Sequence, residues 1–169
     1  MPLERFNHQD AAQLKQFLQH CVHIPRWAEE ISAARPFTSA TAVLAFAKQQ
    51  AHTWTWDEVL GALNTHPRIG EKKAQAELSA QEQAFSAREQ AAAHTHDHTL
   101  QAALYAGNVA YEQRFGYIFL IKAAGLTSHD ILAALQRRLT HDPHTEQQIV
   151  KQQLIAIALL RLEQEFSHD

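Results

Sequence analysis

Cysteine pairs and long hydrophobic runs are missing from this sequence of 169 residues. No apolar stretch approaches the roughly 18 residues that a membrane span requires. The N-terminal residues lack the basic and then apolar pattern of a secretory signal. The single cysteine, Cys21, cannot form an internal disulfide, which fits a reducing compartment. We therefore expect a cytoplasmic protein that has no membrane partner.

Glycine and proline are also scarce, with five of each, which is too few for a loop-rich β protein. Ala, Gln, Leu and Glu dominate instead, and these are good helix formers. A chain of this length can bury a core of its own, so the simplest organisation is a single domain over residues 1–169. Lysine and arginine are scattered and the formal net charge is −3, which argues against nucleic acid as the main partner. The composition predicts an all-α fold.

Start signals and apolar periodicity predict about nine helices and little or no β structure. The start signals are caps at Asn7, Thr55, Ser79 and Ser128 and first-turn prolines at Pro25 and Pro143. The segments assigned to helices are residues 8–21, 24–34, 39–53, 56–64, 79–92, 100–114, 129–140 and 142–166. Residues 115–125 are rich in aromatic and β-branched side chains, so a short strand and a buried helix turn both stay open there.

The stretch NTHPRIGEKK, residues 64–73, places a histidine directly before a proline between two predicted helices. Pro67 fixes its own backbone angle and pushes His66 toward an extended conformation, so the imidazole projects from a stiff corner. An imidazole titrates near pH 6.5, roughly, which suits a general acid or base. A helix-capping turn that happens to contain a histidine is the other interpretation.

Three polar side chains share one face of the predicted helix 79–92. Ser86, Glu89 and Gln90 stand at positions i, i+3 and i+4, so a hydroxyl, a carboxylate and an amide converge there. Such a trio can bind a heterocycle that carries N–H and C=O groups. A solvated helix face is the alternative.

Arg161 stands among the apolar residues of the last predicted helix, in the sequence IAIALLRL. An unpaired buried charge is expensive, so an arginine in such surroundings often has an anionic partner, which its guanidinium binds through two hydrogen bonds. An arginine that extends its charge to solvent at the edge of the core, or a favourable positive charge near a helix C-terminus, explains the pattern equally well.

Twelve histidines suggest a metal site. His94, His96 and His98 alternate around Asp97, and His-Asp pairs recur at residues 129, 141 and 168. Three alternating histidines would need an extended backbone to face one ion, and no cysteine lies nearby. We therefore interpret these residues as helix caps and solvated loop histidines, and we expect no metal.

The order of these pieces resembles the OHCU decarboxylase family, which forms (S)-allantoin in urate breakdown. The motifs that carry the resemblance are WAE at residue 27, RPF at 35, HPRIG at 66, SxxEQ at 86, RFGYIF at 114 and RL at 161. Together they extend over about residues 5–166, nearly the whole chain.

The resemblance implies an all-α fold, a decarboxylation that needs no cofactor, a small-molecule ureidoimidazoline substrate and a homodimer. It marks His66 as the catalytic histidine, with Glu89 and Arg161 as its charged partners. Our own hypothesis for the mechanism is that Glu89 hydrogen-bonds His66 and acts with it as a catalytic residue. The other residues that the resemblance places around the substrate are Pro67, Ser86, Gln90 and the backbone of Phe119, Leu120, Ile121, Lys122 and Ala123. Lys122 is charged where the family pattern is apolar, and Ile118 stands where proline is common.

Two other functions remain open from the residues alone. The His-Asp pairs fit a metal-dependent helical phosphohydrolase, which would hold a divalent ion in stoichiometric amount. A helical binding module without activity would have no pocket shared by His66, Glu89 and Arg161. The sequence does not discriminate among related ureido substrates.

Overall fold

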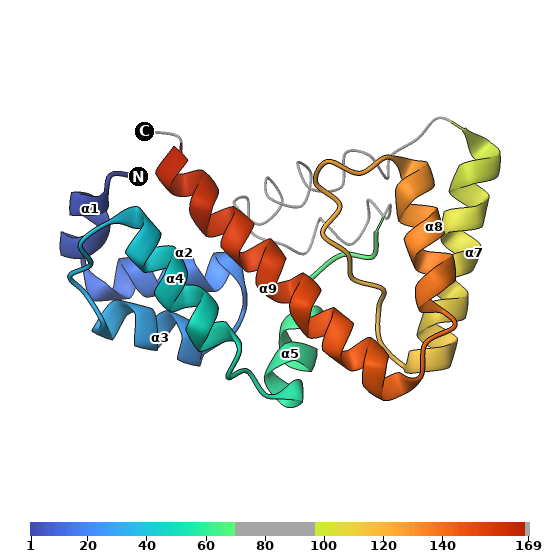
Figure 1. Ribbon diagram of the computed structural model, residues 1–169, viewed down its shortest axis with the longest axis horizontal. Helices are drawn as coiled ribbons and strands as arrows, with labels where there is room; N and C mark the ends of the chain where they lie inside the picture. Colours follow the sequence, from blue (N-terminus) through green and yellow to red (C-terminus); the bar gives the residue numbers. More distant parts are fainter. Residues whose placement is uncertain (70–96, 168–169) are drawn as a thin grey trace. The chain divides into compact units, whose positions relative to one another are not determined.

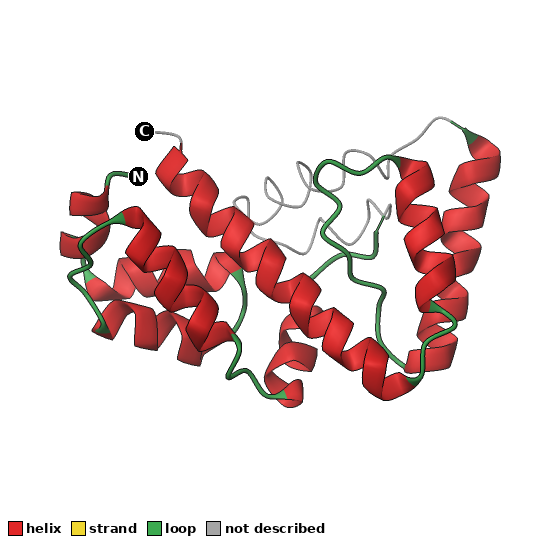
Figure 2. Cartoon of the chain, viewed as in Figure 1, coloured by secondary structure: helices red, strands yellow, loops and turns green. Residues whose placement is uncertain are grey.

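The computed structural model describes residues 1–69 and 97–167. Within those residues the chain forms eight helices and no strand, which confirms the all-α prediction (Figure 1, Figure 2). The helices are α1 (Leu3–His8), α2 (Ala11–Cys21), α3 (Pro25–Ala33), α4 (Ala40–Ala51), α5 (Trp56–Leu63), α7 (His98–Phe115), α8 (Ser128–Arg138) and α9 (Pro143–Ser167). The helix predicted at residues 79–92 lies outside the described residues.

The chain divides into two compact units. The first contains Met1–Ala62 and Ile155–Asp169, and the second contains Leu63–Leu154. The single domain over residues 1–169 stays a prediction.

Several helices begin where the sequence predicts, but the predicted cap of α2 is wrong. Pro25 opens α3, and the Ser39 hydroxyl accepts a hydrogen bond from the Ala42 N–H at 3.0 Å to cap α4. The predicted cap Asn7 lies inside α1, and α2 is capped by Asp10 instead. Asn7 serves the tertiary structure, because its side-chain amide donates to the carbonyl of Phe37 at 2.9 Å.

The first unit packs α2, α3 and α4 around a buried tryptophan. The indole N–H of Trp27 donates to the carbonyl of Ala47 at 3.0 Å, and its ring meets Trp54 edge to face. At the chain ends the Phe6 ring lies 5.4 Å from that of Phe166, so the start of the chain is packed against the end of α9.

The second unit is organised around α7 and α8, which lie side by side (Figure 1). Gly107 allows the close approach, since a Cβ there would lie 2.5 Å from Cδ2 of the buried Leu135. The α8 helix starts with a reciprocal capping box between Thr127 and Asp130, so the predicted cap at Ser128 is wrong by one residue. Buried members of this core are Ile69, Leu100, Leu104, Tyr111, Phe119, Ala123, Ile131 and Leu135.

Residues 116–127, between α7 and α8, form neither of the two structures that the sequence left open. Gly116 adopts a left-handed conformation with φ of 84° and ends α7, and the chain then runs without helix or strand to Thr127. Side chains from distant helices bind this backbone in place of a regular hydrogen-bond pattern, as described below. The aromatic and β-branched composition therefore reflects burial in the core.

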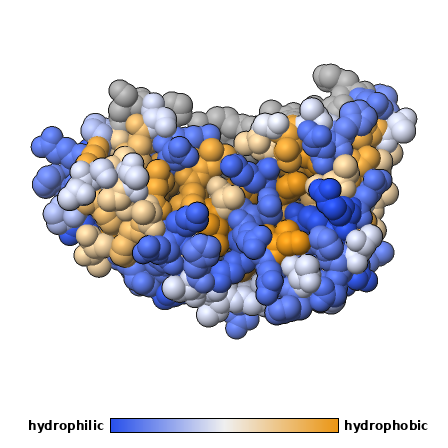
Figure 3. All heavy atoms as spheres, viewed as in Figure 1, coloured by the Kyte–Doolittle hydropathy of each residue, from blue (hydrophilic) through white to orange (hydrophobic). Residues whose placement is uncertain are grey.

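No helix within the described ranges is long and apolar enough to cross a membrane. On the face drawn in Figure 3, hydrophobic residues lie in small areas between hydrophilic ones. Such mixing is ordinary for a surface exposed to water.

Candidate active site

His66 lies on the turn that follows α5. Its backbone N–H donates to the carbonyl of Leu63 at 3.0 Å, which closes the turn directly at the end of the helix. The His66 side chain is half-buried and Pro67 is buried. The histidine is therefore held on a proline corner of restricted backbone, as the sequence predicts.

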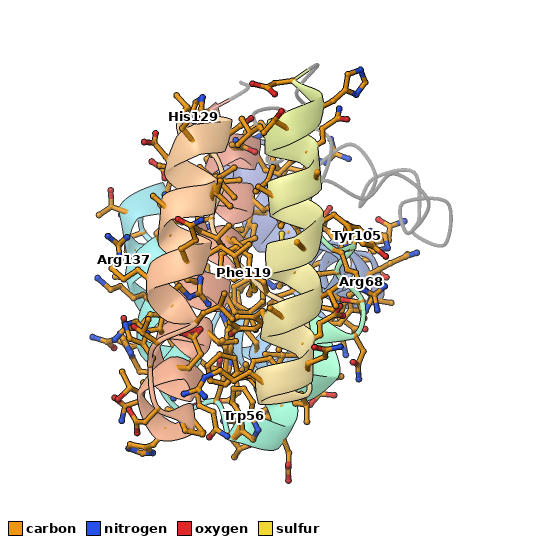
Figure 4. All side chains as sticks on the ribbon, turned by 90° about the vertical axis from the view of Figure 1, so that its right-hand side faces the viewer. Trp56, Arg68, Tyr105, Phe119, His129 and Arg137 are labelled. Atoms are coloured by element: carbon orange, nitrogen blue, oxygen red, sulfur yellow. The ribbon has the colours of Figure 1, made fainter. Side chains whose placement is uncertain are left out.

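Two side chains of α7 bind the residues that follow His66. The Asn108 amide donates to the carbonyl of Ile69 at 3.2 Å, and the Arg68 guanidinium donates to the Glu112 carboxylate at 2.7 Å. Positions 108 and 112 are four residues apart and so face the same side of the helix. The corner is thus attached to α7 at two consecutive residues, and Figure 4 shows Arg68 on the outer side of α7.

The corner and residues 119–123 belong to one hydrophobic core. Ile69, only three positions after His66, is buried in the same cluster as Phe119 and Ala123. Figure 4 shows Phe119 between α7 and α8. The structure therefore brings the predicted catalytic corner and the predicted substrate-binding segment into the same unit.

The segment of residues 119–123 is buried at both ends and half-buried in the middle. Phe119, Leu120 and Ala123 are buried, while Ile121 and Lys122 are half-buried. Its backbone is bound at two points: the carbonyl of Leu120 accepts from Arg138 at 2.6 Å, and the N–H of Lys122 donates to the side-chain oxygen of Gln153 at 2.8 Å. The amide of Lys122 is thus already engaged within the protein.

A buried group of charged and polar side chains lies behind this segment. Arg138 pairs with Glu146, whose carboxylate also accepts a hydrogen bond from the Tyr111 hydroxyl at 2.7 Å. Burial, together with that bond to Glu146, raises the pKa of Tyr111 far above its ordinary value, so the phenol stays protonated. Sequence reasoning missed all three residues, because they form no recognisable motif.

Arg161 lies in the first unit, and its side chain is 4% exposed. One guanidinium nitrogen donates to the carbonyl of Cys21 at 3.0 Å. This burial contradicts the interpretation of Arg161 as an arginine that reaches solvent at the edge of the core.

The remaining predicted site residues Ser86, Glu89 and Gln90 lie outside the described residues, as do His94 and His96. The His-Asp pairs that are described have a structural use. Asp97 caps α7, Asp130 completes the capping box with Thr127 at the start of α8, and a hydrogen bond from Thr145 lowers the pKa of Asp142 just before α9. Over the two described ranges no group of three or more His, Cys, Asp or Glu side chains is placed to hold a metal ion.

An all-α chain with a half-buried histidine on a proline corner and an adjacent irregular, backbone-rich segment fits a small helical decarboxylase. The chain belongs to the OHCU decarboxylase family, whose family model matches residues 7–163. The family resemblance, the decarboxylase class and the all-α fold predicted from the sequence are confirmed at this level.

Relatives of assigned activity agree. A 2-oxo-4-hydroxy-4-carboxy-5-ureidoimidazoline decarboxylase of Haloferax volcanii is 30% identical over 147 residues, which cover 87% of this chain and 84% of the relative. The uric acid degradation bifunctional protein TTL of Arabidopsis thaliana is also 30% identical, over 87% of this chain, but the match spans only 45% of that protein. The bifunctional protein PucL of Bacillus subtilis is 28% identical, and the match spans 32% of its length.

Two solved structures share the fold. A crystal structure of an OHCU decarboxylase in the presence of (S)-allantoin has a TM-score of 0.73 and 24% identity, covering 90% of this chain and 98% of that one. A crystal structure of an (S)-allantoin synthase has a TM-score of 0.65 and 22% identity, covering 97% of this chain and 54% of that one. At these identities the likeness supports the fold alone.

Proposed function

We propose that this chain converts 2-oxo-4-hydroxy-4-carboxy-5-ureidoimidazoline to (S)-allantoin in urate breakdown, without a cofactor. Family membership over residues 7–163 and the archaeal decarboxylase relative support the reaction. The structural observation that carries the proposal is the corner at His66, where a half-buried imidazole follows a helix end and precedes two residues bound to α7.

The reaction itself does not require a cofactor to accept electrons. The substrate bears a carboxylate and a hydroxyl on one ring carbon. When the bond to the carboxylate breaks, CO₂ leaves and the electron pair moves toward the neighbouring ring C=N group. One proton transfer to a single face of the ring then sets the configuration of the product. The protein has to orient the carboxylate, stabilise the developing charge and deliver that proton.

We assign the proton transfer to His66. A histidine on a restricted backbone keeps its ring in one place relative to the substrate, which is what general acid or base catalysis requires. Glu89 hydrogen-bonds the imidazole and sets its protonation in this proposal, and Arg161 binds an anionic oxygen. Ser86 and Gln90 fix the orientation of the ring.

The backbone of residues 119–123 supplies hydrogen bonds to the ureido and ring carbonyl groups. The Lys122 N–H already donates to Gln153, so we assign these contacts to other amides of the segment. Pro67, which is buried next to His66, contributes a rigid apolar contact.

Two further features of the proposal concern the state of the protein. We propose a homodimer in solution, which light scattering tests directly. We also propose a reducing, cytoplasmic location, because the single cysteine is buried and has no second cysteine in the chain with which to form a disulfide.

The activity is tested by generating the unstable substrate in situ from urate with upstream enzymes and following optical rotation. Wild-type protein should accelerate the appearance of optically active allantoin over the spontaneous, racemic reaction. Elemental analysis of the same preparation distinguishes the rival phosphohydrolase, since a stoichiometric metal whose removal abolishes activity would favour that enzyme. If adding the protein does not speed the appearance of optically active allantoin over the reaction without protein, the proposal is rejected.

A further inference from the structure

Among the residues of the second unit that the structure describes, the most deeply buried charges form one ion pair. Arg138 at the end of α8 is 5% exposed, and Glu146 in the first turn of α9 is fully buried. The closest contacts are 2.8 Å from Nη2 and 2.9 Å from Nε of the arginine to the same carboxylate oxygen. A buried ion pair often stabilises a protein no more than apolar residues of the same size would. Stability alone therefore does not explain why this ion pair is present, and its other contacts suggest a further role.

The third nitrogen of the guanidinium does not bind Glu146. Nη1 donates to the carbonyl of Leu120 at 2.6 Å, and the guanidinium carbon lies 4.5 Å from the centre of the Phe119 ring. One arginine thus holds two consecutive residues of the predicted substrate-binding segment, one through its backbone and one through its ring.

Glu146 fixes the arginine in this orientation. Its carboxylate accepts from Tyr111 on α7 at 2.7 Å, and the ring nitrogen of His141 lies 3.2 Å from its other oxygen. The Tyr111 ring also packs on Phe119, at 5.3 Å between centroids. The carboxylate therefore links α7, α8 and α9 to one guanidinium, and through it to residues 119 and 120.

We propose that Arg138 and Glu146 are positioning residues that hold the backbone of residues 119–123 in its substrate-binding conformation. The inference rests on the proposed function, because that function assigns the segment to the substrate. It goes beyond that function because it names two residues, far from the catalytic histidine in sequence, that hold the segment in place. Only an arginine can bind both partners, because a lysine ammonium lacks the planar fork that reaches the Glu146 carboxylate and the Leu120 carbonyl at the same time.

The test compares Arg138→Lys with Arg137→Lys. The Arg138 variant keeps the positive charge beside Glu146 and loses the contact with Leu120. The Arg137 variant is the matched control, because it makes the same substitution at the neighbouring, exposed position of α8 and leaves Arg138 and Glu146 intact. Hydrogen exchange of peptides covering residues 117–125 is measured together with KM and kcat, at a temperature where both variants are fully folded.

For Arg138→Lys we expect faster exchange in residues 117–125, little change in α7, and a loss of about tenfold or more in kcat/KM that arises mainly from KM. Arg137→Lys should leave the exchange of residues 117–125 unchanged, and its kcat/KM should stay within about twofold of wild type. If Arg138→Lys does not fold, Glu146→Gln replaces it, with the same expected result.

Three outcomes decide the question. Faster exchange with a raised KM in the Arg138 variant alone supports the positioning role. Unchanged exchange, or a KM equal to that of wild type in a folded and active variant, shows that the pair is only structural and overturns the inference while the proposed function stands. A wild-type chain that forms no (S)-allantoin overturns the proposed function and the substrate role of the segment with it.

Discussion

The side-chain nitrogen of Asn108 lies 3.2 Å from the carbonyl oxygen of Ile69, and this bond joins the middle of α7 to the corner that carries His66. Asn108 is 7% exposed, so the bond is formed away from water. A buried carbonyl that loses its donor keeps the full cost of its desolvation.

Replacing Asn108 with leucine tests this attachment. The side chains are similar in size, but the variant leaves the Ile69 carbonyl without its donor. We expect the free energy of unfolding to fall by about 1–3 kcal/mol. Turnover should also fall, because the backbone next to His66 is loosened. Chemical denaturation and the allantoin assay measure the two effects. Gln113→Leu on an exposed position of α7 is the control and should change neither; equal losses in both variants would refute the specific role of Asn108.

The second attachment of the corner should contribute less to stability. Arg68 and Glu112 form an ion pair at 2.7 Å, but their side chains are 49% and 25% exposed. Solvent-exposed pairs contribute about 0–1 kcal/mol and weaken with salt. Glu112→Gln should therefore cost less than Asn108→Leu in denaturant unfolding, and the difference from wild type should shrink at high salt. A larger, salt-independent loss would mean that Glu112 has a further buried role.

Two helical glycines should respond to alanine with opposite signs. A Cβ at Gly61 in α5 would meet nothing within 4 Å, so Gly61→Ala should stabilise by about 0.5–1 kcal/mol through helix propensity. A Cβ at Gly107 in α7 would lie 2.5 Å from a methyl carbon of the fully buried Leu135. Overpacking costs about 1–3 kcal/mol, which outweighs the propensity gain.

Thermal unfolding of the two alanine variants provides the comparison, each serving as the control for the other. Stabilisation by Gly107→Ala would show that α8 can move away from α7 without loss. The close packing described for these two helices would then be dispensable.

The ion pair between Arg26 and Glu58 predicts a pH dependence of stability. The hydrogen bond from Arg26 lowers the pKa of Glu58 below its ordinary value of 4.5. A carboxylate with a lowered folded-state pKa stabilises the protein above the unfolded-state pKa, and this contribution is lost as the pH falls through the folded-state pKa. Between about pH 5 and pH 3, unfolding free energy should therefore fall more steeply for wild type than for Glu58→Gln. Parallel curves in denaturant titrations would contradict the assignment.

The sequence predicts the helices well because their start signals are local. Pro25, Ser39 and Pro143 mark the observed starts of α3, α4 and α9. The errors at Asn7 and Ser128 occur where two capable residues lie close together, since Asp10 and Thr127 compete for the same role. Tertiary contacts decide which of two neighbouring residues caps the helix, and the local sequence pattern carries no information about those contacts.

The candidate site also has one part that the local sequence predicts and another that depends on distant contacts. The corner at His66 is predictable because Pro67 restricts it locally. Residues 116–127 are not, because their backbone is bound by Arg138 and Gln153, which lie far along the chain. Arg138 and Glu146 read as ordinary charges near helix ends, and only the fold reveals that both are buried. A buried network assembled from three helices leaves no spacing signal in the sequence.

The most direct test of the central claim is the rate of optically active allantoin formation by His66→Asn under conditions where wild type is active. Asparagine keeps polar character on the corner but cannot transfer a proton near neutral pH. We predict a fall of at least about 10²-fold in turnover with an unchanged melting temperature. Turnover close to that of wild type in the folded variant would contradict the account, because proton transfer would then have to come from another group.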